Sequence, residues 1–117
     1  MATKTKAQGR QQVAQMCGVT SVGQSISPHH ATEIDLAWTA IYDELKDEEL
    51  AIFPSAGPVP AKIEKHLVAL IAMTLTETFG VSGERYNRIV AKNNIAKREI
   101  RKLVQPKYES TDDPEDF

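Results

Sequence analysis

The chain contains a single cysteine, Cys17, among its 117 residues. One thiol cannot form an internal disulfide, so nothing in the sequence requires an oxidising compartment. No basic residue lies at a spacing that would activate Cys17 as a nucleophile, which favours a buried structural thiol. The cysteine content therefore argues against a disulfide scaffold and against a thiol enzyme.

Long apolar runs are also missing. The most apolar stretch of helical length, residues 60–79, is interrupted by Glu64, Lys65, His66 and Glu77. A helix that spans a bilayer needs about 20 nearly unbroken apolar residues. Residues 1–12 are polar and basic and lack the apolar core of a signal peptide. We therefore expect no membrane partner and a protein assembled in the cytoplasm.

The sequence has few residues in patterns that support catalysis or cofactor binding. His29, His30 and Glu33 have the helical spacing of metal ligands, but no further cysteine or histidine lies nearby, so surface histidines are favoured. His66 is typical of a hydrogen-bonded residue at the edge of a core. Residues 80–83 are typical of a turn between helices rather than of a phosphate-binding loop. We expect no metal, no cofactor and no enzyme activity.

Helical periodicity dominates the rest of the chain and predicts an all-α fold, a small four-helix bundle over residues 1–104. The predicted helices cover residues 3–18, 28 to about 46, 60–79 and 83–104. Gly18 would stop the first, Ser27 and Pro28 would open the second, and Ser82 would cap the fourth. Pro60 would fit the first turn of the third helix, and Gly80 would close it.

The third predicted helix is apolar on nearly all sides, so we expect it at the centre of the bundle. Ile63, Leu67 and Leu70 recur at helical spacing, and Trp38 of the second helix should anchor against them. Asn93 falls on the apolar stripe of the fourth helix. A buried amide there needs a partner, so it would set the register between helices or lie at a subunit seam.

Charge is segregated along the chain although the net charge is only −2. Residues 33–49 are acidic, residues 84–102 are basic, and residues 105–117 are acidic again. Such segregation favours contacts between unlike faces, within a chain or between copies. For the basic helix, three interpretations stay open: a solvated face balanced by the acidic helix, a contact face for another protein, or a DNA-binding face that uses Arg88, Lys92 and Arg101 on phosphates.

Two segments have little periodicity. In the proline-containing connection of residues 50–59, Leu50, Ile52 and Phe53 either tuck under the bundle or form an exposed contact patch. Residues 105–117 combine acidic residues with Tyr108 and Phe117. This second segment would be a flexible C-terminal arm that orders on a partner, or an inert solubilising tail.

The order of these elements follows a recognisable arrangement. A short first helix ends in Cys17-Gly18-Val19, an acidic helix contains DLAWTAIYDEL, and a proline-containing loop leads to LVALIAMTL. The pattern FGVSGERYNRIV then opens a basic helix that ends near IRKLV. Over most of residues 5–104 the chain resembles the head-to-tail adaptor proteins of tailed bacteriophages, also called head completion or connector proteins.

The resemblance implies a non-enzymatic structural protein of the virion, located at the head–tail interface. In that family a helical bundle repeats, usually twelvefold, as a homo-oligomeric ring beneath the phage portal protein. The C-terminal segment reaches onto portal subunits, and the ring is a platform for a tail, nozzle or stopper protein. Packaged DNA passes through the channel without sequence-specific binding.

Applied to this sequence, the resemblance implies three sets of contact residues. The portal-docking arm would comprise Gln105, Pro106, Lys107, Tyr108, Asp112, Asp113, Pro114 and Phe117. The contacts between ring subunits would comprise Arg85, Arg88, Lys92, Arg101, Asp43 and Glu44. The tail-facing loop would comprise Ile52, Phe53 and Pro54.

Overall fold

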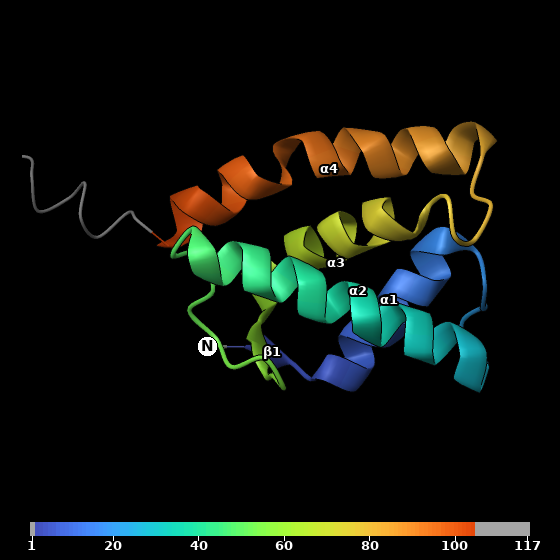
Figure 1. Cartoon of the computed structure of the whole chain (residues 1–117), viewed down its shortest axis with the longest axis horizontal. Coiled ribbons are helices and arrows are strands. Elements are labelled where there is room, and N and C mark those ends of the chain that lie inside the picture. The colour runs from blue at the N-terminus through green and yellow to red at the C-terminus, as the bar shows by residue number, and fades with distance from the viewer. Residues whose placement is uncertain (1, 105–117) are drawn as a thin grey trace, which may run out of the picture.

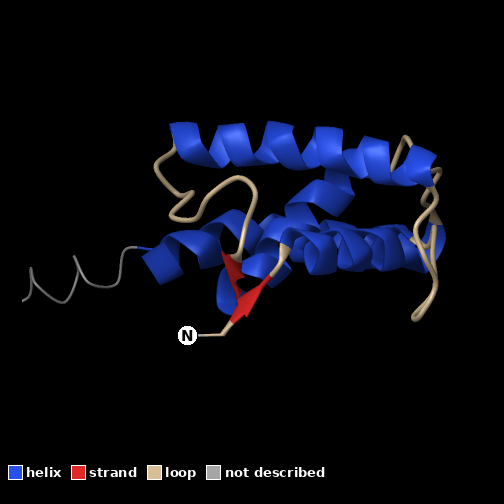
Figure 2. Ribbon diagram, turned by 90° about the horizontal axis from the view of Figure 1, so that it is seen from below, coloured by secondary structure: helices blue, strands red, loops and turns tan. Residues whose placement is uncertain are grey.

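The computed structural model describes residues 2–104, so the predicted arm at residues 105–117 lies outside the described part. The described chain forms four helices: α1 (Lys6–Cys17), α2 (Pro28–Asp47), α3 (Ala61–Leu75) and α4 (Gly83–Val104). Two short strands, β1 (Thr3–Lys4) and β2 (Val59–Pro60), complete it. Helices make up nearly all of the regular structure in Figures 1 and 2, so the predicted all-α class is confirmed.

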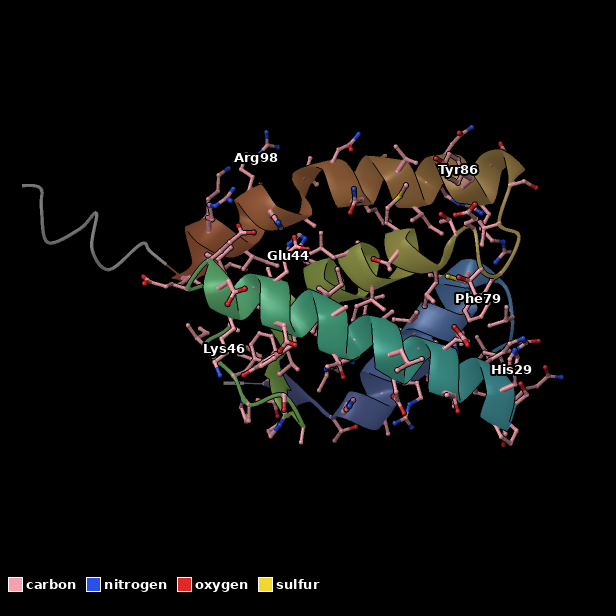
Figure 3. The ribbon with its side chains drawn as sticks, viewed as in Figure 1. His29, Glu44, Lys46, Phe79, Tyr86 and Arg98 are labelled. Atoms are coloured by element: carbon pink, nitrogen blue, oxygen red, sulfur yellow. The ribbon has the colours of Figure 1, made fainter. Side chains whose placement is uncertain are left out.

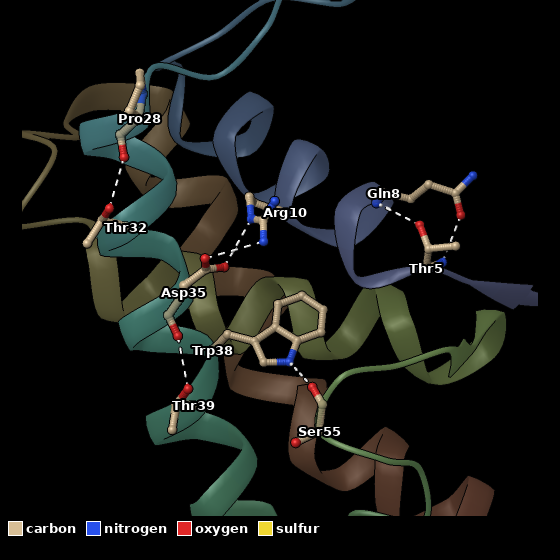
Figure 4. Close-up of polar contacts among 9 residues, drawn as sticks. All are labelled: Thr5, Gln8, Arg10, Pro28, Thr32, Asp35, Trp38, Thr39 and Ser55. Atoms are coloured by element: carbon tan, nitrogen blue, oxygen red, sulfur yellow. Dashed lines mark hydrogen bonds and ion pairs between the residues drawn. The ribbon is translucent and has the colours of Figure 1, made fainter.

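The helix starts follow local capping chemistry. Thr5 Oγ1 accepts a hydrogen bond from the Gln8 amide at 3.1 Å, and Gln8 Oε1 accepts one from the Thr5 amide at 2.9 Å (Figure 4). This reciprocal capping box fixes the start of α1 at Lys6. At α2, Ser27 Oγ accepts from the His30 amide at 3.3 Å, and Pro28 occupies the first turn, as predicted.

Residues 3 and 4 were predicted to be helical, and this was wrong. They form β1, which pairs antiparallel with β2 so that Thr3 faces Pro60 and Lys4 faces Val59. Pro60 is accordingly extended (φ −54°, ψ 132°) and precedes α3 instead of occupying its first turn. Strands of two residues have no readable periodicity, so the sequence alone did not indicate this pairing.

The end of α3 also differs from the prediction. The helix ends at Leu75, and residues 76–80 form a turn in which the Val81 amide donates to the Thr76 carbonyl at 2.8 Å. Thr76 Oγ1 donates to the Met73 carbonyl at 2.9 Å, and such local bonds compete with continued helix. Gly80 takes the predicted left-handed conformation (φ 65°), but it closes this turn rather than the helix itself.

Helix α3 is the centre of the fold and contacts α1, α2 and α4. Ile63, Leu67 and Ile71 are completely or almost completely buried along it. Helices α2 and α4 run in the same direction, and α3 runs in the opposite direction (Figure 1). This arrangement brings the C-terminal halves of α2 and α4 to the same end of the molecule.

Trp38 explains an otherwise unfavourable glycine in α1. Glycine inside a helix costs about 1 kcal/mol relative to alanine, yet Gly9 is buried near the start of α1. A Cβ at this position would lie 2.8 Å from two ring atoms of Trp38. The missing side chain lets the indole pack directly on the α1 backbone, a role that the sequence analysis did not anticipate.

The connection between α2 and α3 is partly core. Leu50 and Phe53 are buried, and Tyr42 Oη donates to the Phe53 carbonyl at 2.8 Å. The two rings of Tyr42 and Phe53 meet edge to face at 5.6 Å. Phe53 is therefore not available as part of the predicted tail-facing loop; only Ile52 and Pro54 of that set are exposed.

Candidate interaction surface

At one end of the molecule the acidic and basic helices are joined by ion pairs. Lys97 Nζ lies 2.7 Å from Glu48 Oε2 and also bonds Glu44. Arg101 Nη2 lies 3.0 Å from Glu48 Oε1. Figure 3 shows Glu44 of α2 beneath the C-terminal half of α4. Glu44 and Arg101, both predicted to contact a neighbouring subunit, are thus engaged within the chain.

The ion pairs favour the charged forms of Lys97 and Glu48. Hydrogen bonds to Glu44 and Glu48 raise the pKa of Lys97, and the hydrogen bond from Lys97 lowers the pKa of Glu48. All of these side chains are at least partly exposed, so water and salt screen the attraction. In this half of α4, Lys97 and Arg101 are thus balanced by the acidic helix, whereas Arg98 and Lys102 pair with Glu99 of α4 itself.

Arg85 is likewise held by its own chain. Its Nη1 donates to the Gln15 carbonyl at 3.2 Å, in the last turn of α1. A cation is favourable there because it opposes the negative end of the helix dipole. Gly18 ends α1 in the left-handed conformation (φ 79°), as predicted, and a Cβ at that position would meet the Arg85 guanidinium at 2.7 Å.

A depression of about 400 Å³ lies between α1 and the N-terminal half of α4. Its lining combines three cations with two amides and two apolar side chains: Arg85, Arg88, Lys92, Gln12, Gln15, Met16 and Ile89. Within residues 2–104, neither Arg88 nor Lys92 takes part in an ion pair. Arg88 and Lys92 therefore give this depression positive charge that no acidic side chain of the described residues neutralises.

A second depression, of about 250 Å³, adjoins the first and shares Gln12, Met16 and Lys92 with it. It adds apolar side chains of α3 and α4 and a basic edge: Val68, Ala69, Ile95, Lys65 and His66. We call the two together the basic groove. Burial lowers the pKa of His66, so this imidazole is neutral at pH 7 and the positive charge comes from the lysines and arginines.

Cys17 lies beside the groove but not in it. The thiol is 5% exposed, with Sγ 3.8 Å from the Ala72 carbonyl oxygen. Burial raises its pKa to about 11, and the nearby charge of Arg85 opposes this shift only in part. The prediction that Cys17 is buried is confirmed.

The two histidines at the start of α2 have different surroundings. His30 packs its ring edge against Phe79 at 5.1 Å, and His29 is exposed at the surface (Figure 3). Within residues 2–104, no three histidine, cysteine or acidic side chains are grouped so that they could hold a metal ion.

Glu64 is a buried carboxylate that the sequence analysis treated as an interruption of an apolar face. The residue is 2% exposed, and its Oε2 has no hydrogen-bond partner in the described chain. Burial raises its pKa, and the charge of Lys4 opposes this shift. Its position one turn before Val68, on a helix apolar on nearly all sides, was a usable signal for burial.

Of the remaining predicted contact residues, the structure describes Asp43 and Asn93. Asp43 is exposed on α2, and no ion pair within the described chain involves it. Asn93 is half-buried and lines an open depression of about 470 Å³ that also includes Ile41 and Met73. The arm residues lie outside the described part of the chain.

Comparisons with protein-family models, curated proteins and solved structures gave no match to this chain. Within residues 2–104, no helix has the length and apolar character needed to cross a membrane.

Proposed function

We propose that this chain is a structural head-to-tail adaptor of a tailed bacteriophage virion. Copies form a ring, of twelve by family resemblance, that docks on the portal protein and extends the DNA channel. The ring is also the platform for a tail, nozzle or stopper protein. The proposal joins the sequence resemblance to an all-α fold whose described surface is rich in charge and lacks a metal centre.

One observation carries the proposal: acidic residues of α2 and basic residues of α4 remain without an ion-pair partner within the described chain. Arg88 and Lys92 lie toward the start of α4, and Asp43 and Asp47 lie in the last turns of α2. Helices α2 and α4 run in the same direction (Figure 1), so these two sets of charges lie on neighbouring, parallel helices. One copy can therefore set its exposed α2 carboxylates against the exposed α4 cations of the next, a contact between unlike surfaces that closes into a ring.

The proposal also includes a tail-facing contact and a portal-docking contact. Ile52 is 59% exposed in the connection before β2, and with Pro54 it supplies the tail-facing contact. Residues 105–117 follow directly from α4 and would bury Tyr108 and Phe117 against the portal while their acidic residues meet basic groups.

The alternative is a DNA-binding or packaging-associated module that uses α4 on phosphates. The structure supports it less well, because Arg101 is paired with Glu48 and Arg85 is bonded to α1. Arg88 and Lys92 remain as its main contacts. A phosphate-binding protein loses affinity steeply as salt increases. Steeply salt-dependent binding to duplex DNA would favour this alternative over the adaptor.

The direct test of the adaptor is to mix the protein with portal rings and to image the product. We expect a ring of this protein on the portal for the full chain. Deleting residues 107–117 should abolish this co-assembly while circular dichroism and the melting temperature stay nearly unchanged, because the buried core lies within residues 13–100. Co-assembly that survives the deletion would contradict the role of the arm, and no binding by the full chain would contradict the adaptor.

A further inference from the structure

The basic groove has the composition of a site for an acidic peptide that carries aromatic side chains. Its cations, Arg88, Lys92 and Lys65, are exposed along the rim. Its floor is apolar and includes Met16, Ile89, Val68 and Ala69. A peptide with carboxylates would meet the rim, and aromatic rings would cover the floor.

The chain itself contains a segment with this chemistry. Residues 107–117 carry two aromatic residues, Tyr108 and Phe117, and five acidic residues against one lysine. The acidic residues are Glu109, Asp112, Asp113, Glu115 and Asp116. The charge of the arm is therefore opposite to that of the groove, and its rings match the apolar floor.

We infer that, before a portal is bound, the arm occupies the basic groove of its own subunit. Ile95, in the groove, precedes Val104 by about 14 Å of helix, and Lys92 precedes it by about 18 Å, at ~1.5 Å per residue. Residues 105–117 span up to about 43 Å when extended, at ~3.3 Å per residue. The arm can thus fold back from the end of α4 and cover the groove.

Attachment to the same chain favours this occupant over a second copy. A short flexible connection gives an effective concentration on the order of millimolar, well above the concentration of separate copies in a dilute solution. Contacts of moderate strength are then sufficient within one subunit and insufficient between subunits.

This contact regulates the surface assigned above to ring formation, and in that respect it rests on the proposed function. While the arm covers Arg88 and Lys92, the α2 carboxylates of a neighbouring copy cannot reach them. Docking of the arm on a portal removes it from the groove and frees these cations. Ring closure then follows portal binding, and a free subunit stays monomeric.

The test places a nitroxide spin label on the arm of the full-length protein through Thr111→Cys. Cys17 does not compete for the reagent, since it is buried and its pKa is raised to about 11. We expect the label to broaden the backbone amide signals of residues 12–16, 65–69 and 88–95, relative to the reduced label. Reversal of the rim charges by Arg88→Glu with Lys92→Glu should increase the intensity of those signals at least severalfold.

Two control variants test whether the broadening depends on the charges of the groove and of the arm. Arg98→Glu with Lys102→Glu makes the same charge change on α4 outside the groove and should leave the broadening in place. Neutralising the arm by Asp112→Asn, Asp113→Asn, Glu115→Gln and Asp116→Asn should remove the broadening without touching the core, so the inference stays testable if the first variant unfolds.

Three results would overturn the inference: no broadening at the groove, broadening that persists in the rim and arm variants, or equal effects of the two pairs of charge reversals. A mixture of spin-labelled protein with isotopically labelled protein shows whether the arm in the groove belongs to the same subunit or to a second copy. Broadening in the mixture would assign the groove to the arm of a second copy and contradict occupation within one subunit. No portal is present, so failure here leaves the portal co-assembly test unaffected.

Discussion

At the scale of single residues, Trp38 connects three segments of the chain. Its indole packs on the backbone of α1 at Gly9, and Nε1 donates to the Ser55 carbonyl at 3.2 Å (Figure 4). Lys6 Nζ lies 5.6 Å from the ring centroid. One side chain thus joins α1, α2 and the connection that precedes β2.

Replacing Trp38 with alanine should lower the free energy of unfolding by ~3–5 kcal/mol, the usual cost of a large buried aromatic truncation. The cavity would lie against a glycine, which has no side chain to fill it. Urea unfolding followed by circular dichroism measures the change. Leu36→Ala, on the same helix but 63% exposed, is the matched control and should change stability little. A mild effect at Trp38 would contradict its central role.

Glu64 should make stability depend on pH in a direction opposite to that of most carboxylates. Its pKa is raised by burial above the ordinary value of 4.5, so the folded state binds more protons than the unfolded state. This group therefore contributes its largest stability below pH 4.5, and that contribution is lost as the pH rises through the raised pKa of the folded protein.

Glu64→Gln should accordingly increase the free energy of unfolding at pH 7 and change it little at acidic pH. The gain at pH 7 reports the size of the shift, at about 1.4 kcal/mol per pKa unit. Denaturant titrations across the pH range would measure the difference between variant and parent. Glu77→Gln, at an exposed site, should leave the pH profile unaltered. A difference between the Glu64 variant and its parent that is independent of pH would contradict the buried, unpaired carboxylate.

At the scale of elements, α2 and α4 are joined by side chains at their C-terminal ends. Lys97 is the centre of this contact because it bonds both Glu44 and Glu48. The pKa of Glu48 is lowered, so its stabilising contribution is present above its ordinary pKa of 4.5 and is lost as the pH falls through the lowered value.

Lys97→Met should cause a small decrease in melting temperature at low salt, and the decrease should shrink at high salt because these side chains are exposed to solvent. Thermal melts at two salt concentrations test this. Lys62→Met, an exposed lysine of α3 without an ion pair in the described chain, provides the comparison. A decrease that is equal at both salt concentrations would mean that packing of the lysine stem, rather than charge, joins the helices.

The elements that the sequence predicted correctly have strong local signals. The capping residue Ser27 with Pro28 marked the start of α2, and Gly18 marked the end of α1. The two strands, the early end of α3 and the role of Gly9 depend on contacts between distant residues, which no local pattern contains. The sequence predicted a basic helix that could be balanced by an acidic one, but it did not predict which cations would form ion pairs. Which of them meet acids of the same chain follows from the parallel directions of α2 and α4.

At the scale of the whole molecule, the charges that are unpaired in the described chain define the proposed ring contact. Reversing Arg88 and Lys92 to glutamate should weaken ring formation on portal at least tenfold while the melting temperature changes little. Counting rings by electron microscopy, beside melts of the same samples, measures both quantities. Arg98→Glu with Lys102→Glu is the matched control, and rings unaffected by the first pair would show that those two cations are only solvated.

The two ends of the described chain differ in how they would resist a pulling force. Residues 3–4 are held by a two-residue strand, together with one bond from the Ala61 amide to the Ala2 carbonyl at 3.0 Å. A load applied at residue 2 would peel these few bonds apart one after another. A load applied at Val104 would instead pull along α4 and shear its whole buried face across α3. The stronger anchorage is therefore at the end from which residues 105–117 continue.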